Sequence, residues 1–244
     1  MFNEVAPQRT ADAVFDQVRD QIVGGALVAG EALPGERELA AQLGVSRGVV
    51  REALQRLSQA GLIDIRHGGA TRIRDFLTST DLNLLQRLMV RSDGSVNARV
   101  LRSLLEMRIS IGVDAARLAA LRADVAAQTA LGDLVDRLAA SDDLLERQDI
   151  DLDFWSKVVE SSGNVAYRIA YNGLAATYRP LRAVIVAVVE PELDNLKDHR
   201  KMVKAIARGD SAAAERAARS LLECSENEWA ELLTALTTEE GNES

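Results

Sequence analysis

Residues 46–74 hold six arginines and only two acidic side chains, which gives this stretch a local charge of +4. The whole chain, by contrast, has a formal net charge of −8. Arg47 and Arg51 are four residues apart, so a helix would present both guanidinium groups on one face. Such groups bind phosphates and the O6 and N7 acceptors of guanine. The pattern predicts a compact DNA-binding surface, and the net charge excludes a protein that coats nucleic acid over its whole surface.

The segments that must position these arginines predict a helix-turn-helix followed by a hairpin. Gly44 is a typical helix end, and Ser46 is a good N-cap for the helix that follows. The second helix of such a pair enters the major groove of DNA, and an added hairpin makes a winged helix. The alternative is a helical hairpin whose arginines form a solvated face. The predicted elements are helices over 11–23, 36–43 and 47–60, and a hairpin of strands over 62–66 and 70–74.

The rest of the chain is helical by periodicity, with apolar residues recurring at three- and four-residue spacing. The fold class is therefore mainly α, with a small winged helix-turn-helix domain before a larger all-α antiparallel bundle. The predicted divisions are a DNA-binding domain over 1–75, a linker over 76–95 with a short helix over 82–89, an effector-binding and dimerisation domain over 96–236, and a disordered tail over 237–244.

Composition excludes several other classes of protein. A single cysteine, Cys224, excludes a disulfide scaffold and a metal site built from several cysteines. No apolar segment approaches the ~20 residues that span a bilayer, and the first 30 residues lack the pattern of a signal peptide. We therefore expect a cytoplasmic protein that has no membrane partner. An enzyme is not expected, because the chain has no phosphate-binding glycine loop in the right context, no paired histidines and no nucleophile elbow.

The first domain resembles the GntR family of bacterial repressors. The resemblance rests on five segments, Leu33–Ala40, Gly44–Arg47, Val50–Leu54, Gly61–Ile63 and His67–Gly69. It implies a homodimer that binds a palindromic double-stranded operator. It also implies which residues contact that operator: Arg37, Ser46, Arg47, Gly48 and Arg51 in the major groove, and His67 and Gly68 at the wing tip in the minor groove.

The second half resembles the effector domain of the FadR branch of that family. Many members hold a divalent metal with one aspartate and three histidines, and here the matching positions are Asp151, His199, Trp155 and Leu221. One carboxylate and one imidazole make a poor zinc site, which needs four donors, or three donors and a water. We therefore expect no metal and no cofactor in this chain, and His199 is interpreted as a polar helix residue.

Motifs less specific than those of the first domain resemble the fatty-acid-responsive members of that branch, which also lack the metal site. This likeness implies a long-chain acyl-CoA as effector. Arg108 lies on an apolar stripe, where a guanidinium needs an anion, so either Asp151 or an acidic ligand group would satisfy it. The alternative effector is a small carboxylate held by Arg108. The predicted ligand-binding residues are Arg108, Asp151, Tyr178, Ser225 and Trp229, whereas Leu222 and Cys224 depart from the pattern of the relatives.

Overall fold

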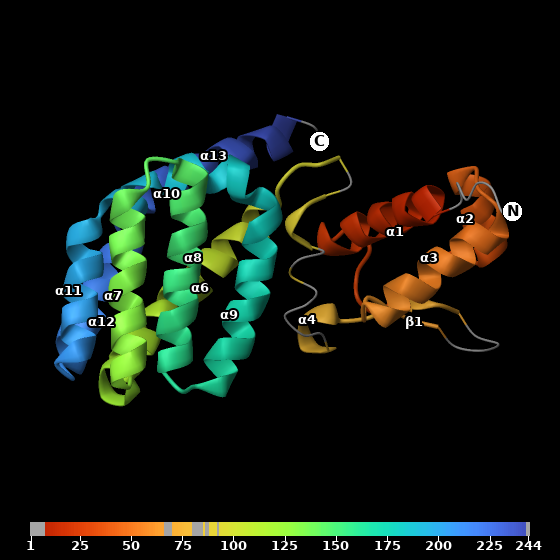
Figure 1. Ribbon diagram of the computed structural model, residues 1–244. Helices are drawn as coiled ribbons and strands as arrows, with labels where there is room; N and C mark the ends of the chain where they lie inside the picture. The colour runs from red at the N-terminus through yellow and green to blue at the C-terminus, as the bar shows by residue number, and fades with distance from the viewer. Residues whose placement is uncertain (1–7, 66–69, 80–84, 86–87, 92, 243–244) are drawn as a thin grey trace, which may run out of the picture. The chain divides into compact units, whose positions relative to one another are not determined.

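The computed structural model describes residues 8–65, 70–79, 85, 88–91 and 93–242 of the chain. It divides the chain into two compact units, Met1–Asn97 and Ala98–Ser244 (Figure 1). The boundary lies at the end of the predicted linker. Within the described residues, no helix is long and apolar enough to cross a membrane.

The first unit packs helix α1 against α3. Val14 and Val18 of α1 and Leu54 and Leu57 of α3 are buried, which explains the helical spacing of these residues in the sequence. Gly44 ends α2 in the left-handed conformation (φ 66°), where a side chain would be strained. The elements are α1 (Gln8–Val23), α2 (Glu36–Leu43), α3 (Arg47–Gln59), β1 (Ile63–Asp64), β2 (Arg72–Ile73) and α4 (Phe76–Ser79).

The predicted hairpin forms, but its paired part is short. Strands β1 and β2 are antiparallel, with Ile63 opposite Ile73. The wing tip, with His67 and Gly68, lies outside the described residues. So does most of the predicted helix over 82–89, of which only residues 85, 88 and 89 are described, all of them helical. The chain leaves the hairpin through the single turn of α4, which the sequence did not predict.

The second unit is an all-α bundle around the long helix α6, which packs against α8, α11 and α12. Asp124, Asp143, Asn164 and Asp210 each accept a backbone N–H at the start of a helix, so polar residues set the turns between the apolar stripes. The helices are α6 (Ala98–Arg122), α7 (Val125–Ala140), α8 (Leu144–Ser161), α9 (Val165–Tyr178), the 3-10 turn η1 (Arg179–Leu181), α10 (Arg182–Asp194), α11 (Leu196–Ala207), α12 (Ser211–Leu222) and α13 (Glu226–Asn242).

The predicted disordered tail is wrong over most of its length, because α13 continues to Asn242. Thr237 and Thr238 donate their hydroxyl hydrogens to backbone carbonyls three or four residues earlier. These bonds satisfy the polar side chains inside the helix, so a stretch of threonines and glutamates continues the helical ladder instead of ending it.

Candidate functional site

Helix α3 presents its first turn to solvent. Ser46 caps the helix by accepting the N–H of Val49 at 3.4 Å, and Arg47 and Gly48 follow it as exposed residues. A Cβ built on Gly48 would meet only the Ser46 hydroxyl, at 3.8 Å, so the surface there is open. Together with exposed Arg51 one turn later, these residues form a single face that a DNA groove can approach.

Arg51 is already paired within the protein. Its Nη2 and Nε donate to the carboxylate of Glu36 on α2, at 2.8 and 3.1 Å. The hydrogen bond from Arg51 lowers the pKa of Glu36. Arg51 keeps 62% of its side-chain surface exposed, so the pair is weak and a DNA phosphate can compete with the carboxylate.

Two of the six arginines in the basic stretch instead make contacts within the first unit. Arg56 joins α3 to α1 through Asp12 and also pairs with Glu52. Arg72 donates to the backbone carbonyl of Gly30 at 2.7 Å. The DNA-facing cations of the first unit are therefore fewer than the local charge indicates. Among the described residues, the predicted set Arg37, Ser46, Arg47, Gly48 and Arg51 is exposed on α2 and the start of α3.

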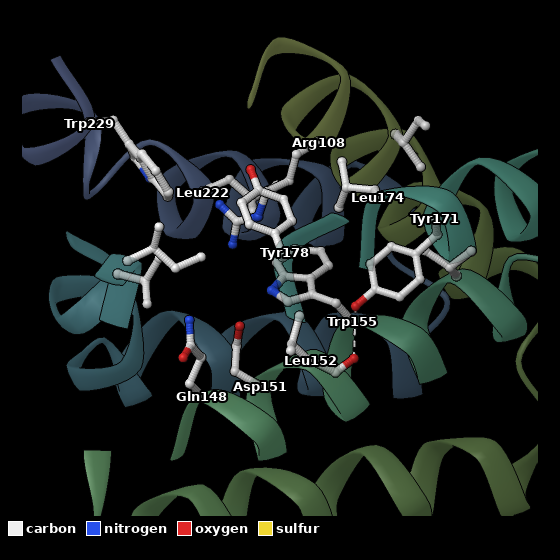
Figure 2. Close-up of a pocket in the computed structure, with 15 residues that line it drawn as sticks. Arg108, Gln148, Asp151, Leu152, Trp155, Tyr171, Leu174, Tyr178, Leu222 and Trp229 are labelled. Carbon is white, nitrogen blue, oxygen red and sulfur yellow. Dashed lines mark hydrogen bonds between the residues drawn. The ribbon is translucent and has the colours of Figure 1, made fainter. Parts of the chain in front are cut away.

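The second unit encloses a cavity between α6, α8, α9, α10, α12 and α13 (Figure 2). Its volume is about 40 Å³. That is room for about three waters. Four of the five predicted ligand-binding residues line it: Arg108, Asp151, Tyr178 and Trp229. Ser225 is buried just before α13 but is not among the lining residues, and its carbonyl accepts the Trp229 N–H.

Arg108 is paired with a carboxylate that the sequence analysis did not identify. Its Nη1 donates to Glu192 Oε1 at 2.8 Å, and its Nη2 donates to Glu192 Oε2. Both carboxylate oxygens act as acceptors, as in the ionised form of Glu192. Burial disfavours the charge on Arg108, but Glu192 outweighs burial and raises the pKa of Arg108. The expectation that Asp151 or a ligand neutralises Arg108 is therefore corrected. The neutralising group is the carboxylate of Glu192, which is fully buried.

Asp151 is paired with His199 instead. The Nε2 of His199 lies 3.0 Å from Asp151 Oδ1, and its Nδ1 lies 3.0 Å from the carbonyl oxygen of Asn195. Both partners are acceptors, so both ring nitrogens must carry a hydrogen, which describes the imidazolium. Burial lowers the pKa of His199, but the hydrogen bond and charge of Asp151 outweigh burial and raise it. The cavity thus holds two self-neutralised charge pairs.

Other polar atoms at the cavity have no hydrogen-bond partner among the described residues. They are Gln148 Oε1, Trp155 Nε1, Tyr178 Oη and Trp229 Nε1. Gln148 and Trp155 are not among the ligand-binding residues predicted from the sequence. Their spacing in the sequence could have identified them. Gln148, Asp151 and Trp155 lie at i, i+3 and i+7 and therefore share one face of α8.

At two of the positions where the family resemblance implies histidine, the residues are apolar and packed. Trp155 is 4% exposed and Leu221 is fully buried. A Cβ on Gly112 of α6 would lie 2.8 Å from the Leu222 side chain and 3.2 Å from the Trp155 ring, so the glycine makes room for both side chains. No group of three or more metal-ligating side chains occurs within the described part of the chain.

The Asp151–His199 pair predicts how stability depends on pH. Because the folded state raises the pKa of His199, its contribution is fully present below the unfolded pKa of about 6.5 and is lost as pH rises through the folded pKa. The free energy of unfolding of the native chain minus that of His199→Gln should therefore shrink from pH 6 to pH 9. Urea denaturation at several pH values measures it, and a difference that grows with pH would contradict the imidazolium assignment.

Comparison with known proteins gives matches in both units. Residues 10–73 match the gntR family of bacterial regulatory proteins, and residues 103–223 match the FCD domain. The HTH-type transcriptional regulator Mce2R of Mycobacterium tuberculosis is 40% identical over 219 residues, which cover 90% of this chain and 91% of that protein. The fatty acid metabolism regulator protein of Pectobacterium atrosepticum is 31% identical over 175 residues, 71% of each chain.

Among solved structures, Lar of Listeria monocytogenes shares the fold. It aligns with a TM-score of 0.53 at 17% identity, over 95% of this chain and 100% of its own. At that identity the likeness concerns the arrangement of the helices alone.

Proposed function

This chain belongs to the gntR family of bacterial regulatory proteins and carries an FCD domain as its second half, and from that membership we propose a ligand-responsive regulator. It binds a palindromic operator as a homodimer and controls fatty-acid metabolism in response to a long-chain acyl-CoA. Members of this family regulate transcription and are not enzymes. A regulator that acts on DNA works in the cytoplasm.

The exposed start of α3 supports the DNA half of the proposal. Arg47 and Arg51 lie on one exposed face, and Gly48 next to Arg47 leaves the surface there open. A single module of this size buries only about 600–1,000 Å² of protein surface on DNA, so two half-sites are needed for nanomolar affinity. A twofold dimer then reads an inverted repeat. The family resemblance adds His67 and Gly68, which lie outside the described residues, as proposed contacts to the minor groove.

The effector half of the proposal rests on one observation. The charged groups of the cavity are already neutralised within the protein, and the other walls are aromatic and aliphatic. Arg108 has its anion in Glu192, and Asp151 has its cation in His199, so a ligand need not bring charge into the bundle. The apolar chemistry of these walls suits an acyl chain, and relatives at about 30% identity are named as fatty acid metabolism regulators. Tyr178 and Trp229 add unpaired polar atoms to the walls, and Ser225 lies buried just before α13.

The small volume of the cavity couples ligand binding to a change in the conformation of the bundle. About 40 Å³ cannot hold a long acyl chain, so binding requires the surrounding helices or side chains to move apart. A ligand that binds the opened bundle better than the closed one shifts the population between them. Through the linker over 76–95, that shift changes the spacing of the two recognition helices and hence the affinity for the operator.

The second candidate is a small carboxylate effector, and the same volume favours it. Its difficulty is electrostatic. The carboxylate would have to displace Glu192 from Arg108, and Glu192 would then be a fully buried charge without a partner.

Selection of bound sequences from a random DNA pool, with sedimentation velocity on the free protein, tests the DNA half. We expect enrichment of an inverted repeat and a mass of two chains. A monomer, or enrichment of a single unrepeated half-site, would contradict the proposal.

We also expect no bound metal. Trp155 and Leu221 are apolar where ligands would be needed, and His199 already uses both ring nitrogens. Elemental analysis of protein purified without chelators should find well under one zinc, nickel or manganese per chain. One metal per chain would overturn this expectation.

A further inference from the structure

Trp155 is a buried hydrogen-bond donor without a partner among the described residues. Its side chain is 4% exposed, and its indole Nε1 meets no acceptor. An indole N–H normally finds a partner when it is buried, because leaving it unpaired costs free energy. Figure 2 shows the indole nitrogen facing the open space between Arg108 and Gln148. The missing acceptor is therefore expected to come from a molecule in that space.

The ring itself is held in one place. The absence of a side chain at Gly112 on α6 leaves space for the indole and for Leu222, and the Phe154 ring contacts the indole edge-on at a centroid distance of 5.9 Å. A donor fixed in this way is pre-organised, so a ligand acceptor that reaches it is bound without first ordering the side chain.

The charges around Trp155 select the kind of acceptor. Asp151 lies one turn earlier on the same face of α8, so an anion at the indole nitrogen would approach a carboxylate. The one cation among the residues lining the cavity, Arg108, is held by Glu192 through both carboxylate oxygens. No lining residue of this described cavity offers an uncompensated positive charge. A neutral oxygen avoids these costs, whereas a carboxylate does not.

We propose that Trp155 is a ligand-binding residue whose indole N–H donates to the neutral carbonyl oxygen of an acyl thioester or ester, and that the cavity discriminates against free carboxylates. This rests on the proposed acyl effector and adds the atom that recognises its head. Gln148, with an unpaired Oε1 on the same face of α8, lies on the other side of the opening and turns its amide to suit the bound group.

A thioester and a thioether of the same chain length separate the effect of the carbonyl from that of the rest of the ligand. Dodecanoyl-CoA and S-dodecyl-CoA differ only in the carbonyl oxygen, which the thioether lacks. For the native chain we expect dodecanoyl-CoA to bind about tenfold tighter, the worth of one buried hydrogen bond. In Trp155→Phe that ratio should fall to about one, whereas in Tyr167→Phe, a control that removes a hydroxyl outside the cavity lining, it should persist. A ratio unchanged by Trp155→Phe would overturn the proposal.

The indole protons provide a readout that needs no substitution at Trp155. The chain has two tryptophans, so its proton NMR spectrum contains two indole N–H signals, and the variant Trp229→Phe shows which signal belongs to which residue. Dodecanoyl-CoA should move the Trp155 signal downfield, and S-dodecyl-CoA should not. Equal shifts with both ligands would contradict a hydrogen bond to the carbonyl.

Methyl decanoate and decanoate test the discrimination against charge. The neutral ester should bind several-fold tighter at pH 7, because the carboxylate meets Asp151 and finds no free cation. Tighter binding of decanoate would overturn the inference while leaving an acyl effector in place. If none of the four probes binds the native chain, the proposed acyl effector itself falls, and the inference falls with it.

Discussion

Glu192→Ala should lower the free energy of unfolding of the second unit by about 3–5 kcal/mol, because it leaves the Arg108 guanidinium buried without an anion. Glu192 has no exposed surface, and the Arg108 side chain is only 14% exposed, so water cannot replace the lost carboxylate without opening the bundle. Urea denaturation followed by circular dichroism measures the loss.

The matched control removes both charges at once. The double variant Arg108→Met, Glu192→Leu keeps similar volumes and leaves no unpaired charge, so it should be much closer in stability to the native chain than Glu192→Ala is. If Glu192→Ala loses less than about 1 kcal/mol, or if the double variant is the less stable of the two, the pair is not the isolated buried interaction described here.

Arg47→Ala should weaken operator binding by roughly 1–3 kcal/mol and relax the preference at one base pair. The guanidinium stands at the exposed start of α3, where a recognition helix contacts base edges, and its loss removes a bidentate contact to guanine. Gel shifts on the operator and on variants at each position measure both effects.

Arg216→Ala is the control for charge alone, since it removes an exposed arginine from α12 in the other unit. It should leave operator affinity and base preference nearly unchanged. If Arg47→Ala weakens operator and random DNA equally, Arg47 contacts only phosphate and its assignment to base recognition is wrong.

The first unit could be predicted from sequence because its signals are local. Gly44 and Ser46 mark the turn between α2 and α3 through their own backbone and capping chemistry, and the apolar spacing of α1 and α3 gives the buried faces. The pairing of Arg51 with Glu36 could not be predicted in this way. It joins residues 15 positions apart on different helices, and only the packed unit brings them together.

The cavity could be predicted only in part. Arg108, Tyr178 and Trp229 were expected to face a ligand, and they line one cavity. Glu192 was missed, because it lies 84 positions from Arg108 and nothing local marks it as a partner. The Asp151–His199 pair spans 48 positions and was missed for the same reason. In each case the partner is chosen by helix packing, which apolar periodicity alone does not specify.

We expect an acyl chain bound in the second unit to change the operator affinity of the first. Titrating the protein–operator complex with acyl-CoAs from C8 to C18 tests it most directly, with DNA occupancy as the readout. Each buried methylene contributes about 0.8 kcal/mol, so the concentration that changes occupancy by half should fall steeply as the chain lengthens, until the cavity is full. DNA occupancy that does not depend on acyl chain length, together with a response to a short hydroxy acid or sugar acid, would contradict this expectation and favour the small-carboxylate effector.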